Sequence, residues 1–127
     1  LFLKKVLTNL LTSVIIIVLI MNKTMKKNLM AATMEQVAVI HTVGKSKPQT
    51  VAMVYVEKDL NVQQKAEIAF MATQSIKDAW WNNDNVVPIF DNGDTVRSTV
   101  YGDQVLVGNE KYEWVDMDST PLVKRII

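Results

Sequence analysis

The sequence contains no cysteine among its 127 residues. This absence excludes disulfide bonds, thiolate metal ligands and a thiol nucleophile, and it carries no information on the compartment. Histidine occurs once, as His41, so any histidine-dependent mechanism would rest on that side chain. Zinc prefers nitrogen and sulfur ligands, so a chain with one histidine and no cysteine is not expected to be a zinc protein. A disulfide-bonded scaffold is excluded by the absence of cysteine.

Charge is distributed unevenly along the chain, although its net value is only +1. Residues 1–30 contain five lysines and no acidic residue, whereas the remainder has nine basic and thirteen acidic residues. Binding to nucleic-acid backbones needs clustered lysine and arginine. The mildly acidic remainder therefore argues against nucleic acid as a partner.

The N-terminal segment is mostly apolar between Lys5 and Lys23. A membrane-spanning helix needs about 20 apolar residues, and only Val14–Met21 is uninterrupted by polar side chains. We therefore divide the chain into this apolar and basic segment, residues 1–30, and a small domain with a C-terminal tail, residues 31–127.

Three interpretations of the N-terminal segment are open. In the first, the segment is a membrane anchor or an uncleaved signal, with Val6–Met21 as the part in contact with a membrane. In the second, the segment is a cleaved signal, although the lysines that follow the apolar run oppose translocation. In the third, it is upstream sequence, translated from Leu1 in front of a true start at Met21 or Met25.

Alternating apolar residues predict a β-hairpin at the start of the domain. Met34–Val43 alternates as a half-buried strand does. Thr50–Lys58 is apolar on both faces from Val51 to Val56, which is typical of a central strand. The intervening GKSKPQ favours a loop.

A helix is predicted over Asn61–Trp81. Asn61 can cap its first turn, with Gln64 three residues later as in a capping box. An apolar stripe rich in alanine runs along one side, so the helix can lie close to a sheet. The stripe consists of Val62, Ala66, Ala69, Ile76 and Trp80.

Three strand segments are predicted after the helix, followed by an extended tail over residues 118–127. Pro88 favours an edge strand or a bulge for the first of them, and Asn92–Gly93 favours a hairpin turn before the second. The segments are Val86–Phe90, Thr95–Tyr101 and Gln104–Met117, the last of which folds back on itself at Gly108–Glu110.

The resulting order, β-β-α-β-β-β with short turns, predicts an α+β fold. In this fold a single helix packs on a mainly antiparallel sheet. A small, strongly curved, barrel-like sheet is the alternative.

No motif for catalysis or cofactor binding is present. There is no glycine-rich phosphate loop between a strand and a helix, no nucleophile elbow, and no serine beside a credible base. His41 alternates with apolar residues in a predicted strand, which favours a packed or edge histidine over a catalytic one. We therefore expect no cofactor and no enzymatic activity.

Four aspartates are the one set that could bind a hard cation, because calcium and magnesium prefer carboxylate oxygen. Their spacing matches no calcium loop, and aspartates at strand ends and turns commonly cap the backbone. We expect no metal site. A carboxylate-dependent metalloenzyme would require at least the side chains of Asp91, Asp94 and Asp103 to converge in space. The four are Asp84, Asp91, Asp94 and Asp103.

Aromatic residues and one arginine are the candidate partner-binding residues. When Trp80 faces the core, Trp81 lies at the core boundary, where it either covers the sheet edge or anchors a partner protein. Trp114 and Tyr101, on the late strands, would extend such a patch. Arg97 is expected to pair with an acid across the sheet or to contact the partner.

The combination of SIKDAWWNN, RSTVYGDQVLV and KYEW resembles a pattern in small proteins of bacteriophages and mobile elements. In those proteins an Ile-x-x-(Ala/Ser)-Trp helix end precedes an Arg-Ser-Thr/Met-Ser-Val-Gly-Asp turn and a Val-x-Val-x-Gly-x-x-Tyr hairpin. The similarity extends over Ala66–Trp114. The matching turn positions are Arg97, Ser98, Thr99, Gly102 and Asp103.

The chain departs from that pattern in two places. Val100 and Tyr101 replace the usual Ser-Val, and a Gly-Phe pair common after the last strand is missing. The resemblance implies an origin in a phage or mobile element more than an activity, and the missing pair weakens the transfer of any binding site.

Two functional hypotheses therefore stand beside the metalloenzyme. The first is a small phage-type accessory protein that binds a host or phage protein without catalysis. The second is a membrane-anchored protein whose lysines are attracted to the inner face of the host membrane. Both place the protein in the host cytoplasm or at the cytoplasmic face of the membrane.

Overall fold

A computed structural model describes residues 22–91, 94–117 and 120–126. The chain divides into two units, residues 1–33 and 34–127. In the first unit, helix α2 spans Lys23–Thr33, and the Asn22 side chain accepts a hydrogen bond from the Met25 amide. Within the described residues no helix is long and apolar enough to cross a membrane. The predictions for Val6–Met21 concern residues outside this description.

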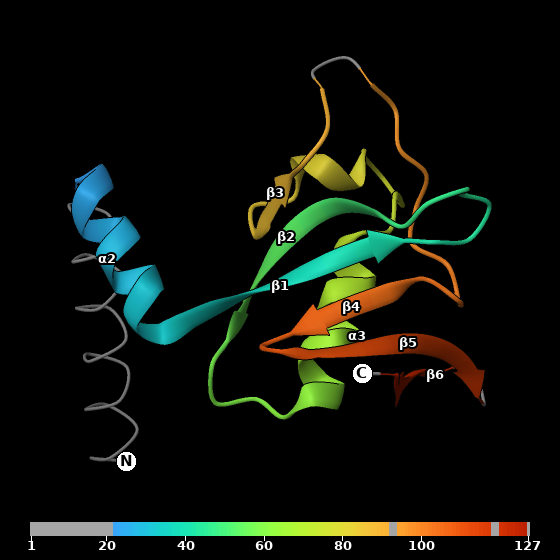
Figure 1. Cartoon of the computed structure of the whole chain (residues 1–127). Coiled ribbons are helices and arrows are strands. Elements are labelled where there is room, and N and C mark those ends of the chain that lie inside the picture. The colour runs from blue at the N-terminus through green and yellow to red at the C-terminus, as the bar shows by residue number, and fades with distance from the viewer. Residues whose placement is uncertain (1–21, 92–93, 118–119, 127) are drawn as a thin grey trace, which may run out of the picture. The chain divides into compact units, whose positions relative to one another are not determined.

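The second unit is an α+β domain, which confirms the predicted fold class (Figure 1). Its six strands pair antiparallel in the order β3-β2-β1-β4-β5-β6, and helix α3, Val62–Ala72, packs against the sheet. The described pairings leave β3 and β6 as edges, so the sheet is open and not a barrel. The strands are β1 Met34–His41, β2 Gln49–Glu57, β3 Val86–Pro88, β4 Gln104–Val107, β5 Glu110–Met117 and β6 Thr120–Arg125.

The predicted hairpin and the predicted capping box are both present. β1 and β2 pair from Met34↔Glu57 to His41↔Gln49, with a register shift between Val39 and Ile40. The Asn61 side chain accepts a hydrogen bond from the Gln64 amide, and the Gln64 side chain accepts one from the Asn61 amide. Two of the four otherwise unpaired amides at this helix start are thereby satisfied.

The core lies between α3 and the sheet face that it covers. Alternate residues of the central strands point toward the helix, and the small Ala66 and Ala69 let the helix approach closely. Beside this core the largely buried Lys65 of α3 forms an ion pair with Glu35 of β1. The strand residues of this core include Val37, Val39, Ala52, Val54, Val56, Val105 and Trp114.

The helix is shorter than predicted, ending at Ala72 and not at Trp81. The Thr73 hydroxyl bonds back to the Ala69 and Phe70 carbonyl oxygens, and the Gln74 side chain also donates to the Phe70 carbonyl. These side chains occupy the carbonyls that the next helical turn would have used. A separate 3-10 turn, η1, then places Trp80–Asn82.

Two further segments differ from the sequence-based prediction. Residues 95–100 form no strand, because their backbone bonds to side chains and to the end of α3. Conversely, the predicted tail contains a strand: β6 pairs with β5 from Tyr112↔Arg125 to Met117↔Thr120. A complete backbone ladder stabilises this strand, although its local sequence gives no clear strand signal.

Candidate functional site

Asp103 lies at the end of the sheet where β1 ends and β4 begins, and its side chain is fully buried. Its Oδ1 accepts hydrogen bonds from the amides of Thr42 and Val43, at 3.0 and 3.1 Å. Its Oδ2 accepts one from the Val100 amide at 2.9 Å. One carboxylate thus joins the β1–β2 hairpin to the segment in front of β4.

Arg97 forms a two-pronged ion pair with this carboxylate. Nη1 lies 2.6 Å from Asp103 Oδ2, and Nη2 lies 3.0 Å from Oδ1. The same guanidinium donates to the carbonyl oxygens of Ser98 and Val43, at 3.0 and 2.7 Å. Charge-assisted pairs of this geometry are among the strongest hydrogen bonds in proteins.

The carboxyl group remains ionised in spite of its burial. Burial acts to raise the pKa of Asp103, but the hydrogen bonds from Arg97 and from the Val100, Thr42 and Val43 amides outweigh it. The pKa of Asp103 therefore lies below its ordinary value. The hydrogen bond to Asp103 correspondingly raises the pKa of Arg97.

Gly102 allows the hairpin and the turn to approach each other. Its φ is +99°, and a Cβ atom there would lie 2.8 Å from Val43 Cγ2. Its carbonyl accepts a hydrogen bond from the Thr42 hydroxyl, and its amide donates to the Trp114 carbonyl. A residue with a side chain would strain the backbone and also displace Val43.

His41, at the end of β1, begins a buried chain of hydroxyl contacts. Its Nε2 lies 3.1 Å from Thr99 Oγ1, and Thr99 Oγ1 lies 2.7 Å from Thr73 Oγ1. Because the Thr73 hydroxyl donates to the Ala69 carbonyl, it accepts from Thr99, and Thr99 in turn accepts from His41 Nε2–H. This assigns the proton to Nε2 and leaves Nδ1 as an acceptor without a partner in the described structure.

The histidine is neutral at neutral pH. Burial lowers its pKa from 6.5 to about 4, against the opposing influence of the Asp103 charge. The nearest carboxylate oxygen, Asp103 Oδ2, lies 3.8 Å from Nε2.

This cluster has the residue types of a hydrolase triad but not its arrangement. A triad places the acid on one imidazole nitrogen and the nucleophile on the other. Here Thr99 and Asp103 both lie on the Nε2 side of His41, and all three side chains are buried. The geometry therefore fits a structural cluster that fixes two loops, and no substrate could reach the Thr99 hydroxyl.

The predicted turn motif is brought together, whereas the predicted aromatic residues are divided between two ring clusters. Arg97, Thr99, Gly102 and Asp103 all take part in the cluster, and Ser98 Oγ accepts a hydrogen bond from the Ser75 amide at 2.9 Å. Trp81 is half-buried in an edge-to-face trio with two other rings. That trio consists of Trp80, Trp81 and Phe90.

The two later aromatic residues belong to a second ring cluster. Tyr101 stacks on Phe70 at 5.3 Å, and Phe70 meets Trp114 edge-on at 5.5 Å. Trp114 is fully buried and donates through Nε1 to the Ala66 carbonyl. The expectation that Trp114 contributes to a partner-binding surface is therefore wrong, because its ring is a core residue.

Several residues of the site were not predicted from the sequence. His41 was expected to pack, but its hydroxyl partners Thr73 and Thr99 lie far along the chain. The Trp80 indole holds the backbone in front of the motif by donating to the Val96 and Arg97 carbonyls, at 3.0 and 3.1 Å. The position of Trp80 in the apolar stripe of the predicted helix indicated only that its ring would be buried.

The aspartates do not converge. Asp103 is bound to Arg97, whereas Asp84, Asp91 and Asp94 are all exposed. Among the described residues, no group of three or more histidine, aspartate or glutamate side chains could hold a metal ion. The geometry that the metalloenzyme hypothesis requires is thus not found in this part of the chain.

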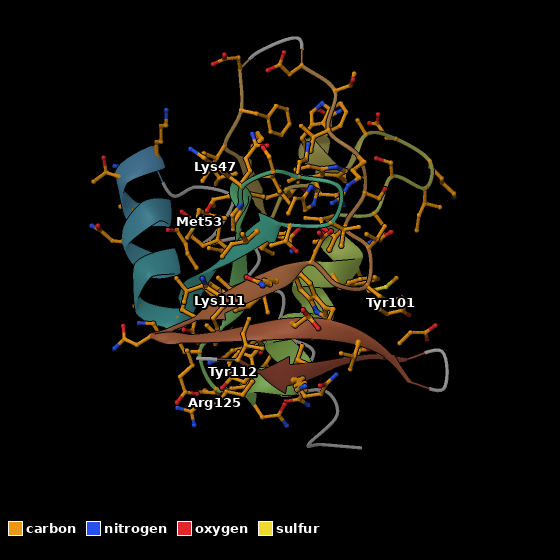
Figure 2. All side chains as sticks on the ribbon, turned by 45° about the vertical axis from the view of Figure 1, so that its right-hand side comes forward. Lys47, Met53, Tyr101, Lys111, Tyr112 and Arg125 are labelled. Carbon is orange, nitrogen blue, oxygen red and sulfur yellow. The ribbon has the colours of Figure 1, made fainter. Side chains whose placement is uncertain are left out.

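Three apolar side chains stand exposed around the Gly102–Asp103 turn, and we call them the turn surface. Val43, Val100 and Tyr101 are 42%, 39% and 37% exposed. Figure 2 shows Tyr101 at the opposite end of the sheet from Lys111. A polar depression of about 540 Å³ lies beside Arg97, lined by Lys45, Gln49, Phe90, Asp94, Thr95, Val96 and Arg97.

Comparison with protein-family models, with curated proteins and with solved structures gives no match for this chain.

Proposed function

We propose that this chain is a small, non-enzymatic protein-binding module that holds its partner with the turn surface. The observation that carries the proposal is the attachment of three exposed apolar side chains to a backbone fixed by the ion pair between Arg97 and the buried Asp103. The proposal includes a phage or mobile-element origin and a partner in the host cytoplasm or at the inner face of its membrane.

The connection between β3 and β4 supports this proposal. It runs from Ile89 to Asp103, and its described residues contain no helix and no strand beyond one isolated bridge. Connections of this length without regular structure are uncommon in compact domains and are usually functional. Binding residues are often found on such loops when a rigid scaffold positions them.

The segment is also fixed on both sides. The Trp80 indole and the Gln74 side chain hold carbonyls along it, and the Thr99 amide donates to the Thr73 carbonyl at 3.1 Å. A surface that is ordered before binding loses less conformational entropy when a partner docks. This rigidity favours a recognition loop over a linker.

The chemistry of the turn surface fits a protein partner. Tyrosine and arginine are enriched among the residues that dominate binding energy at protein interfaces. Tyr101 presents a ring already positioned by Phe70, and the Arg97 guanidinium lies at the border with about one third of its side chain exposed. Trp81 is largely committed to the Trp80 and Phe90 rings, which makes it a support for the loop.

A pulldown of bound proteins from host-cell lysate, with the tagged full-length chain as bait, tests the proposal. Val100→Asp and Tyr101→Ala alter the turn surface, whereas Met71→Asp alters an apolar residue on α3 that is more exposed than either, and it serves as control. We expect the first two variants to lose the same bound protein, which the control retains. Urea unfolding of each variant verifies that the fold is intact. If both turn-surface variants recover the same proteins as the wild type, the turn surface is not the binding site.

A further inference from the structure

The two edge strands of the sheet carry backbone groups that could pair with another chain. An open edge is a template for adding a strand, either from a partner or from a second copy. Whether an edge can do so depends on its outward amides, which alternate with the amides that face the neighbouring strand.

At β6 the outward amide positions are the odd-numbered residues. The Ile126 amide donates to the Lys111 carbonyl, and with the antiparallel register this places the amides of 121, 123 and 125 on the outer side. Pro121 has no amide hydrogen. The Val123 amide is already bound to the Gln63 side chain, at 3.1 Å from its Oε1.

At β3 the outward positions are Val86 and Pro88. The Ile89 amide donates to the Val51 carbonyl, and the Tyr55 amide donates to the Asn85 carbonyl. The backbone amides and carbonyls of the odd-numbered residues in this segment therefore face β2. The Val86 amide bonds to the Asn83 carbonyl at 3.1 Å within the preceding turn. Pro88 again supplies no donor.

We propose that both edges of this sheet are protected against strand addition, because four of their five outward amide positions are either prolines or already bonded within the domain. The same two devices act at each edge: a proline at one outward position and an internal hydrogen bond at the next. Two of the three prolines of the chain serve this purpose. The remaining outward position, Arg125, is exposed, and its side chain pairs with Glu110 at 3.1 Å.

This inference is independent of the proposed function, since an edge is closed or open whether or not the turn surface binds a partner. It concerns how any protein can approach the sheet. Recognition by a complementary strand, which is a common mode for small sheet proteins, is disfavoured at both edges.

Disulfide trapping in the full-length chain tests the closure. The chain has no cysteine, so a single cysteine reports only on its own position. Lys124→Cys, on β6, is placed in the wild-type background and in an opened background that carries Pro121→Thr and Gln63→Ala. Under mild oxidation we expect little disulfide-linked dimer in the wild-type background. In the opened background the dimer yield should be at least about fivefold higher, because each restored backbone hydrogen bond favours pairing about fivefold.

Ser46→Cys, on the exposed hairpin loop, is the matched control, and its dimer yield should be the same in both backgrounds. The opposite edge supplies an independent variant, since Pro88→Thr restores an outward amide next to Val87→Cys. The proposal is overturned if Lys124→Cys dimerises readily in the wild-type background. It is also overturned if opening neither edge raises the yield of the edge cysteine above that of the control.

Discussion

The domain has two interiors of opposite character. Under α3 the sheet buries valines, alanines and Trp114, whereas the end of the sheet near the turn surface buries His41, Thr73, Thr99 and Asp103. The apolar interior is stabilised by area removed from water and depends little on direction. The polar interior depends on the pairing of each donor with an acceptor, because an unpaired buried polar group is costly.

This difference separates two tasks within one small domain. The apolar interior holds the helix on the sheet. The polar interior holds two loops that lack regular structure, and through them the turn surface. We therefore expect changes in the first to alter global stability alone, and changes in the second to alter stability together with the order of the loops.

The largest effect is expected from Trp114→Ala, in the apolar interior. The change removes a fully buried ring, its contact with Phe70 and its hydrogen bond to the Ala66 carbonyl. Loss of a buried tryptophan costs about 4 kcal/mol, which urea unfolding measures. Trp114→Phe keeps most of the ring and should cost less than half as much. Equal losses for both variants would mean that the ring is not packed as described.

A slightly smaller effect is expected from Asp103→Ala, in the polar interior. Three backbone amides and Arg97 then lose their acceptor. Breaking a buried pair leaves an uncompensated charge, at a cost of about 3 kcal/mol for a partly exposed arginine. The double variant with Arg97→Ala removes that charge as well, so its loss should be smaller than the sum of the two single losses. Strict additivity would show that the two side chains do not interact.

Acid should weaken the polar interior through His41. Its pKa is about 4 in the folded domain and about 6.5 when unfolded, so the unfolded chain binds the proton more readily. This contribution to stability is constant above pH 6.5 and falls as the pH is lowered toward 4. Between pH 7 and pH 5 the free energy of unfolding should drop by about 2 kcal/mol.

His41→Gln separates this effect from other titrations. Asp103 contributes stability that is lost only at lower pH, as the pH falls through its lowered folded pKa. Urea unfolding at pH 7 and pH 5 should therefore show the drop in the wild type and little change in His41→Gln. The same drop in both proteins would assign the acid sensitivity to another group.

The smallest effect, and the sharpest contrast between the two interiors, comes from Thr99→Val. In an apolar interior an added methyl group in place of a hydroxyl would stabilise the fold. Here it leaves His41 Nε2–H without its acceptor and Thr73 without its donor, at a cost of about 1 kcal/mol. Calorimetry should show a lower melting temperature. A higher one would mean that the hydroxyl chain contributes nothing.

The two interiors also differ in how far the sequence predicts them. The β1–β2 hairpin and the capping box at Asn61 follow from residues a few positions apart, and both were predicted. The helix end was not predicted, because the Thr73 hydroxyl that bonds back to the Ala69 carbonyl is also bound by Thr99, a partner 26 residues later in the chain. The partners of the polar interior are set by tertiary contact, which periodicity does not encode.

The turn motif was predictable only in its local features. Gly102 and Asp103 indicated a tight turn, and Arg97 indicated a partner acid, because these are local properties of the residue types. Nothing local showed that the acid would also bind the hairpin amides of Thr42 and Val43, about sixty residues earlier in the chain. Nor did local spacing distinguish the buried Trp114 from the exposed Tyr101.

Amide hydrogen exchange in the full-length chain tests most directly the claim that Asp103 holds both loops. Slow exchange is expected for the amides of Thr42, Val43 and Val100 in the wild type, because each donates to the buried carboxylate. In Asp103→Ala these three amides should lose protection while that of Val39, in the centre of the sheet, persists. If these three amides of the wild type exchange at the rate of unstructured amides, the Asp103 carboxylate does not hold the two loops.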